Sequence, residues 1–548
     1  MSDSDAPSFS LIDQPWLRVR RTDGTLEELS LLEVLRQAHQ LTALAGELPT
    51  QVFALTRLLL AVLHQAVSGP RDDEHWEQLW TANTLPADEV SVYLGRYRSR
   101  FDLLDPVAPF FQVAGLRTAK GEVSKLTKLI ADVPNGNPFF TMRAGRGTAS
   151  MTFAEAARWV VHAQAFDPSG IKSGAVGDAR VQGGRGYPIG VAWDGLLGGV
   201  LVEGATLRET LLLNLVARDF PLIAEWAGSD APVWERPPVG PGEEAAGGRA
   251  VLGPVDLYTW QSRRIRLSVT GGTVTGVLIS NGERLTPQNK HRVEVHTAWR
   301  RSETQEKKHR EALVYMPREH TPERSVWRGL QSLLPGTAGR HGSDGQAALA
   351  PIVLEWLAHL RLTTILHRDF PMRVRTVGMK YGSNSSVVDE VIDDALSMRA
   401  VLLEQDAAHL AQSATHAAEA AEACARALGR LAGTLAEAGG GEFSGPRERA
   451  EELAYAELDT PFRTWLASLT EQSQPLEAEQ QWHVQADRII ARLARGLVEQ
   501  ASPAAWSGRT VKGNLVTTAH AEMWFRRNLA KAVPMAHPTI PTEQGVSA

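Results

Sequence analysis

The chain has 548 residues and a formal net charge of −6, with 43% hydrophobic and 22% charged residues. This length exceeds what one hydrophobic core usually serves, so the composition predicts a soluble globular protein of two or three domains. We find no apolar run long enough to span a membrane and no basic-then-apolar N-terminus, so we expect a cytoplasmic location. The single cysteine, Cys424, excludes an intrachain disulfide and a cysteine-based zinc cluster.

Charge is unevenly distributed along the chain. Lys and Arg outnumber acids six to two over residues 116–147 and eight to three over 284–310, whereas acids outnumber bases twenty to nine over 387–500. This pattern is typical of a protein that holds a nucleic acid at one end and a protein at the other. An acidic helical region that is merely solvated is the alternative.

The first half of the chain reads as an extended segment followed by helices. Hydrophobic spacing and turn signals predict a strand within 11–21 and helices over 29–38, 50–67 and 72–82. Thr152 and Glu155 have capping-box spacing, which predicts a helix over 151–166.

Two glycine-studded basic loops flank that last helix, at residues 137–147 and 167–188. Glycine lets backbone N–H groups approach a ligand closely, and Lys and Arg neutralise phosphate. The loops therefore indicate a surface for a nucleic-acid backbone, against the alternative of ordinary polar connections. Their cations are Arg143, Arg146, Lys172, Arg180 and Arg185.

The second half changes character near its middle. A Val- and Thr-rich stretch with a Gly-Gly turn predicts a hairpin within 256–317, with a further strand over 292–299. Everything from Val387 onward reads as helical, beginning with a helix over 389–438. We therefore expect an α+β fold: an N-terminal mixed domain over 1–386 with a small sheet, and a C-terminal four-helix bundle over 387–548.

Catalytic motifs are not found. The segment around Lys172 and Ser173 lacks the glycine spacing of a phosphate-binding P-loop and of a nucleophile elbow. The histidine pairs have no metal-ligand spacing. The acidic cluster Asp389, Glu390, Asp393 and Asp394 could bind a divalent ion, although we interpret it as the start of a helix, where carboxylates meet the helix dipole favourably. We expect no catalytic residues, no metal and no cofactor.

Six segments in order resemble a known family: LIDQPWLRVR, APFFQV, NPFF with GRG, GIKSG with GG shortly after, LRETLLLNLV, and the helical C-terminal region. Together they are similar to the large subunit (CasA type) of Cascade, the type I-E CRISPR surveillance complex. The resemblance implies a non-catalytic protein of RNA-guided antiviral defence. Its implied partners are double-stranded target DNA, the 5′ end of the guide RNA (crRNA), the other Cascade subunits and a recruited helicase-nuclease.

In that family the large subunit reads the protospacer-adjacent motif (PAM) through the minor groove, helps to start unwinding and R-loop formation, and positions the helicase-nuclease. The minor groove carries degenerate information, which suits small polar and backbone contacts. Sequence beyond the PAM is read by pairing with the guide.

The resemblance also assigns residues. The glycine loop that reads the PAM corresponds to Pro168, Ser169 and Gly170, just before Lys172, where relatives carry a run of glycines. Lys290 corresponds to the lysine inserted into the minor groove. Ser383, Asn384 and Ser385 correspond to the wedge beside the PAM, where glutamine is more usual. The docking loop near the guide RNA and PAM comprises Asn137, Phe139, Phe140, Arg143 and Arg146.

Two other functions stay open at this point. One is a metal-dependent nucleic-acid-modifying enzyme that uses the acidic cluster. The other is a scaffold whose basic loops bind only guide RNA and neighbouring subunits.

Overall fold

The computed structural model describes residues 7–133, 145–224, 230–335, 348–404 and 408–537. It divides into two compact units, each assembled from three stretches of chain. The first comprises Met1–Arg324, Ala338–Ile365 and Met372–Ala395, and the second comprises Ser325–Thr337, Leu366–Pro371 and Leu396–Ala548. Helices and small sheets mix in the first unit and helices dominate the second, which confirms the predicted α+β class.

The N-terminal part of the first unit pairs a three-stranded sheet with helices. The strand order is β2-β1-β3, and Ser30 caps α1 reciprocally with Glu33. Helix α2 is buried along most of its length, as its apolar sequence predicts. The elements are β1 (Leu17–Arg21), β2 (Leu26–Leu29), α1 (Leu31–Gln37), β3 (Leu41–Ala45), α2 (Pro49–Ala66), α3 (Asp73–Thr81) and α4 (Ala87–Arg96).

Helix α5 (Phe153–Phe166) is largely buried in this unit, and the glycine loop over 167–188 follows it. The Thr152 hydroxyl accepts from the Glu155 backbone N–H at its start, so the predicted helix and its cap are confirmed. Twelve of its residues are buried. A 3₁₀ turn, η5 (Gly145–Thr148), precedes it, and the short strand β4 (Lys172–Ser173), paired with β5 (Arg185–Gly186), follows it.

The predicted hairpin is present as β7 (Arg263–Thr270) and β8 (Thr273–Asn281). Gly271 and Gly272 form the turn with φ of 58° and 75°, a conformation that favours glycine. The strand expected over 292–299 is wrong: only β9 (Trp299–Arg301) forms, in the order β10-β9-β11 with β10 (Tyr315–Pro317) and β11 (Ala348–Leu349). Residues 291–293 form a turn instead, closed by the hydrogen bond from the Glu294 N–H to the Lys290 carbonyl, and the Glu294 side chain is buried against Arg57.

A third sheet has the order β13-β12-β6, with β6 (Gly199–Glu203), β12 (Pro371–Tyr381) and β13 (Val388–Arg399). The helix expected from Asp389 is wrong, because residues 388–399 pair with β12 as a strand. Arg375 on β12 donates to Asp393 at 2.6 and 2.9 Å, so a cross-strand ion pair stabilises this register. The remaining helices of the unit are α6 (Leu207–Leu213), α7 (Pro254–Tyr258), α8 (Glu303–His309) and α9 (Ile352–Leu362).

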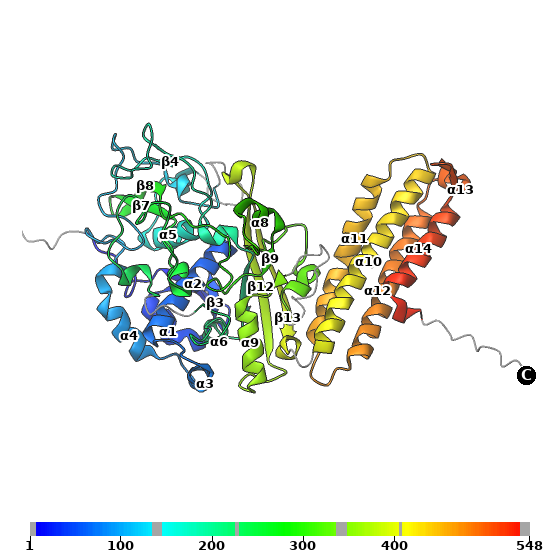
Figure 1. The fold of residues 1–548 in the computed structure, drawn as a ribbon, viewed down its shortest axis with the longest axis horizontal. Coiled ribbons are helices and arrows are strands. Elements are labelled where there is room, and N and C mark those ends of the chain that lie inside the picture. The colour runs from blue at the N-terminus through cyan, green and yellow to red at the C-terminus, as the bar shows by residue number, and fades with distance from the viewer. Residues whose placement is uncertain (1–6, 134–144, 225–229, 336–347, 405–407, 538–548) are drawn as a thin grey trace, which may run out of the picture. The chain divides into compact units, whose positions relative to one another are not determined.

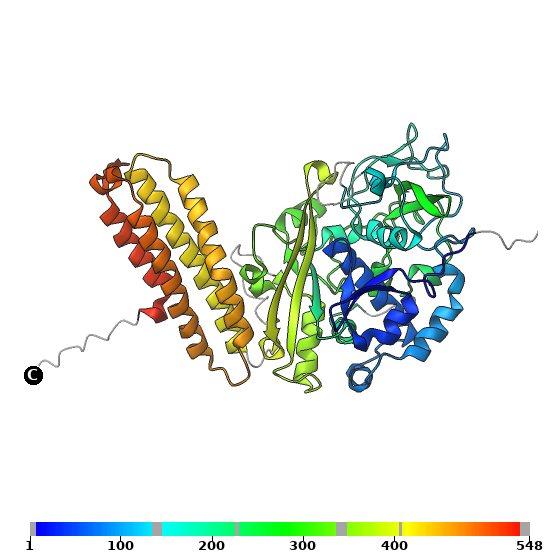
Figure 2. The same cartoon turned by 180° about the vertical axis from the view of Figure 1, so that it is seen from behind.

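The second unit contains four long helices that run side by side (Figures 1 and 2). They are α10 (Ala408–Ala438), α11 (Ser444–Ser468), α12 (Pro475–Glu499) and α14 (Thr518–Ala532), with α13 (Pro503–Ser507), β14 (Arg509–Val511) and β15 (Asn514–Val516) before α14. The predicted helical bundle is confirmed. Trp482 is fully buried in it and donates to the Ala417 carbonyl at 2.8 Å. Among the described residues, no helix is both long and apolar enough to cross a bilayer.

Candidate nucleic-acid interface

A cavity of about 300 Å³ opens beside the glycine loop that follows α5. Its lining comes from residues 167–173, from residues between 124 and 131, and from His162, Ala163, Ile279, Ser386, Val387 and Val388. It therefore joins stretches that are distant in sequence. Pro168, Ser169, Gly170 and Lys172, all predicted to contact DNA, lie in this lining.

Asp167 forms a buried ionic cluster at the base of the loop. Its carboxylate lies 2.5 Å from the Lys172 ammonium and 2.5 Å from the Arg263 guanidinium. Burial raises the pKa of Asp167, but the two cations outweigh burial and hold that pKa below its usual value. Burial lowers the pKa of Lys172, and the Asp167 charge opposes that effect. The Lys172 side chain is only 13% exposed, so its ammonium faces a carboxylate instead of open solvent.

Arg263, at the start of β7, clamps the loop through its backbone. One of its guanidinium nitrogens donates to the carbonyls of Asp167, Pro168 and Gly190, at 3.1, 3.0 and 2.8 Å. Gly170 follows with a backbone φ of 117°, which residues that carry a side chain rarely adopt. The loop is thus held in a conformation that its sequence permits.

The predicted wedge touches this loop directly. The Ser169 N–H donates to the Ser385 carbonyl at 2.8 Å, and the Tyr381 hydroxyl donates to the Phe166 carbonyl at 2.7 Å. The turn between β12 and β13 holds Asn384 and Ser385 at φ of 55° and 52°. Ser383 and Asn384 are exposed at its tip. The structure therefore brings together two of the segments that the family resemblance assigns to one interface.

Lys290 belongs to another part of the first unit and does not line the cavity. It is half-buried, burial lowers its pKa, and its ammonium lies 3.4 Å from the Gln288 carbonyl. The neighbouring Asn289 is fixed to Tyr315 by two hydrogen bonds, of 3.0 Å from its N–H and 2.8 Å to its side-chain oxygen.

Below Lys290, the chain is anchored in the core. The Lys290 carbonyl accepts from the Glu294 N–H at 2.9 Å, and Glu294 accepts from both Arg57 terminal nitrogens at 2.9 and 2.8 Å. Arg57 and Glu294 are fully buried. The base of the Lys290 segment is therefore rigid, whereas its ammonium is held by a long hydrogen bond.

The remaining predicted cations differ in accessibility. Arg180 is mostly buried and pairs with Asp178 and Glu243, so its guanidinium is engaged within the protein. Arg185 is exposed beside the Gly183–Gly184 turn. Asn137, Phe139, Phe140 and Arg143 lie outside the described residues. Arg146 falls within η5, and its side chain is likewise outside the description.

Sequence reasoning missed the residues that hold the site together. Asp167, Arg263 and Arg57 have partners far along the chain, so no local spacing identifies them. The one local signal is that Asp167 lies five residues before Lys172.

The acidic cluster on β13 does not resemble a metal centre. Successive residues of a strand point to opposite faces, and Asp393 is already paired with Arg375. Within the described ranges, no three His, Cys, Asp or Glu side chains gather in a way that could hold a metal ion.

Comparisons with known proteins converge on one family. The model of "CRISPR-associated protein Cse1" matches residues 10–493. A CRISPR-associated protein CasA/Cse1 from Thermus thermophilus is 32% identical over 377 residues, covering 65% of this chain and 67% of that protein.

Solved structures agree over almost the whole length. The crystal structure of Thermobifida fusca Cse1 has a TM-score of 0.91 and 48% identity, covering 98% of this chain and 100% of that one. Cse1 from Acidimicrobium ferrooxidans has a TM-score of 0.80 and 30% identity, covering 97% and 99%.

Proposed function

This chain belongs to the Cse1 family, the large (CasA-type) subunit of the type I-E CRISPR Cascade complex, and on that premise we propose that it recognises the PAM in double-stranded target DNA. In this proposal it reads the motif through the minor groove, helps to start unwinding and R-loop formation, and positions the recruited helicase-nuclease. It acts by binding, without catalysis, in the cytoplasm. Its other partners are the 5′ end of the guide RNA and the neighbouring Cascade subunits.

One observation carries the proposal: the Ser169 N–H bonds the Ser385 carbonyl, which places the Pro168–Gly170 loop and the Ser383–Ser385 turn side by side. Both segments present small polar side chains and backbone groups, which suit the shallow information of the minor groove. A wedge beside a reading loop would couple recognition to strand separation.

Lys290 joins this proposed set from a separate segment. Hydrogen bonds of Asn289 and Glu294 hold the backbone on either side of it. Its long side chain would therefore carry the ammonium into a narrow groove while the backbone stays in place. Lys172 stays in the set with its ammonium shared with Asp167. Asn137, Phe139, Phe140, Arg143 and Arg146 remain the proposed docking loop near the guide RNA and the PAM.

The test is binding of reconstituted Cascade, with and without this subunit, to duplex targets that carry or lack candidate PAMs. Lys290→Ala should lower PAM-dependent affinity by about tenfold, the loss expected when one good groove contact is removed. Lys308→Ala is the matched control, because Lys308 is an exposed lysine on α8 outside the proposed interface.

Affinity that needs this subunit but ignores the PAM would replace the proposal with a scaffold role. Equal effects of Lys290→Ala and Lys308→Ala would remove Lys290 from the reading set. Metal-dependent cleavage by the isolated chain that Asp393→Asn abolishes would favour an enzyme instead.

A further inference from the structure

We infer that Arg263 is a positioning residue for PAM recognition: it sets the shape of the Pro168–Gly170 loop and, through that loop, the place of the Ser383–Ser385 wedge. The inference rests on the proposed function and extends it to a residue that contacts no DNA. It follows from the contacts of one buried guanidinium.

Arg263 uses its guanidinium entirely within the protein. Its side chain is 1% exposed. It donates to the Asp167 carboxylate and to the carbonyls of Ser262, Asp167, Pro168 and Gly190. Only a planar group with several donors can hold a carboxylate and several carbonyls at once, so lysine is no equivalent here.

The clamp reaches the wedge in one further step. Pro168, whose carbonyl Arg263 holds, precedes Ser169, whose N–H holds the Ser385 carbonyl. A side chain at position 170 would place its β-carbon 3.6 Å from the Ser386 side chain, so the two loops also lie close together at the next residue. A shift of the clamped carbonyls therefore displaces the wedge relative to the reading loop.

Lys172 gives the cluster its second cation. Without Arg263, the Lys172 ammonium alone would face the Asp167 carboxylate. The ion pair would persist while the carbonyl clamp is lost. Charge balance and loop geometry can therefore be separated by mutation.

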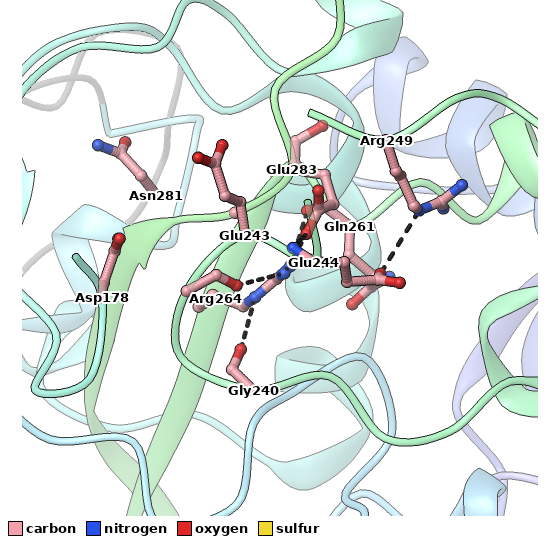
Figure 3. Close-up of polar contacts among 12 residues, drawn as sticks. Asp178, Gly240, Glu243, Glu244, Arg249, Gln261, Arg264, Asn281 and Glu283 are labelled. Atoms are coloured by element: carbon pink, nitrogen blue, oxygen red, sulfur yellow. Dashed lines mark hydrogen bonds and ion pairs between the residues drawn. The ribbon is translucent and has the colours of Figure 1, made fainter. Parts of the chain in front are cut away.

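Arg264, the next residue on β7, is a matched control (Figure 3). It is fully buried, pairs with Glu283 at 2.5 Å, and donates to the Gly240 and Gly242 carbonyls at 2.8 Å each. It is also an arginine that clamps a loop through a carboxylate and carbonyls. That loop lies outside the proposed interface.

The experiment compares Arg263→Lys with Arg264→Lys in reconstituted Cascade. The ratio of affinities for duplexes with and without the PAM should fall about tenfold for Arg263→Lys and stay within about twofold for Arg264→Lys. Thermal unfolding and complex assembly are measured alongside. An unchanged ratio in a folded Arg263→Lys variant, or an equal fall in both variants, would overturn the inference.

Hydrogen exchange supplies a second readout that a purely structural role would not localise. Peptides over 167–173 and 381–387 should both exchange faster in Arg263→Lys and remain protected in Arg264→Lys. Protection retained in both peptides would also overturn the inference. If Arg263→Lys does not fold, Arg263→Gln replaces it, since it removes the guanidinium and leaves the Asp167–Lys172 ion pair in place. We then expect faster exchange in both peptides and a reduced ratio, and unchanged values would refute the inference.

Cascade with the unmutated subunit (the parent complex) distinguishes failure of the proposed function from failure of the positioning role. If the parent complex shows no PAM dependence, the proposed function itself fails. If the parent depends on the PAM and Arg263→Lys behaves identically, only the positioning role fails.

Discussion

Asn384 lies at the tip of the proposed wedge, where its backbone fits the turn and its amide is the group that would contact DNA. Its φ of 55° and ψ of 23° lie in the left-handed region, where Asn and Gly are tolerated and β-branched residues are strained. We predict that Asn384→Gly leaves the midpoint of thermal unfolding unchanged but lowers the PAM affinity ratio, because the amide is lost. Asn384→Val should instead cost about 1–2 kcal/mol of stability. A full PAM ratio in Asn384→Gly would show that only the turn matters.

The buried carboxyl of Asp194 should make the stability of the protein depend on pH. Burial raises its pKa to about 7, Arg57 opposes that rise, and Glu294 adds to it. Because the folded pKa exceeds the unfolded value of 3.8, the folded state binds more protons between those values. The stabilising contribution is present below the unfolded pKa and is lost as pH rises through about 7.

Asp194→Asn removes this titration. The parent should therefore lose about 2 kcal/mol of unfolding free energy, relative to the variant, between about pH 5 and pH 8. Urea unfolding at both pH values measures the difference. A parallel pH profile in the two proteins would show that Asp194 does not titrate in this range.

At these positions the sequence identifies polar candidates but not their surroundings. The exposed tip residues Ser383 and Asn384 come from a recognisable loop. Lys172 also comes from a recognisable loop, yet its ammonium pairs with Asp167. Arg263, which pairs with the same carboxylate, lies about ninety residues further along the chain. Long-range ion pairs of this kind leave no periodic or local signal.

The element η8 (Val326–Ser332) shows how a short segment joins a distant core. Trp327 is fully buried in the second unit, stacks on Phe462 with ring centroids 4.7 Å apart, and donates to Asp459 at 2.9 Å. We predict that Trp327→Ala destabilises the second unit by about 3–5 kcal/mol, the usual cost of truncating a buried tryptophan. Chemical denaturation of the full chain measures this cost.

Trp524→Ala on α14 is the control for that measurement, since this side chain is 40% exposed. Its effect should stay below about 1 kcal/mol. A loss in Trp327→Ala as small as that in Trp524→Ala would mean that η8 contributes little to the bundle.

Helices with strong periodicity and caps, such as α2 and α5, follow from the sequence because their signals are local. Residues 388–399 do not, because their acids resemble a helix start while their strand state depends on pairing with β12 and on Arg375. The assignment of 325–337 to the second unit is equally non-local. Elements defined by distant partners are the ones that pattern reasoning misses.

For the whole molecule, we expect exposed charges to set the overall affinity for DNA and the geometry of the loops to set the preference for the PAM. Lys125 and Lys128 are exposed on the segment that contributes to the cavity wall, and Lys128 lines it. Cations that meet phosphates release counterions, so each contact steepens the dependence of log K on log salt by about 0.9.

The double variant Lys125→Ala with Lys128→Ala should therefore flatten that slope by about 2 and weaken binding to duplexes with and without the PAM alike. Asn384→Gly should do the reverse, changing the PAM ratio while the slope holds, because an uncharged amide displaces no counterion. Titrations of reconstituted Cascade at several salt concentrations give both quantities at once. A lysine variant that alters the PAM ratio without altering the slope would mean that these cations read the groove itself, and the separation of charge from geometry would not hold.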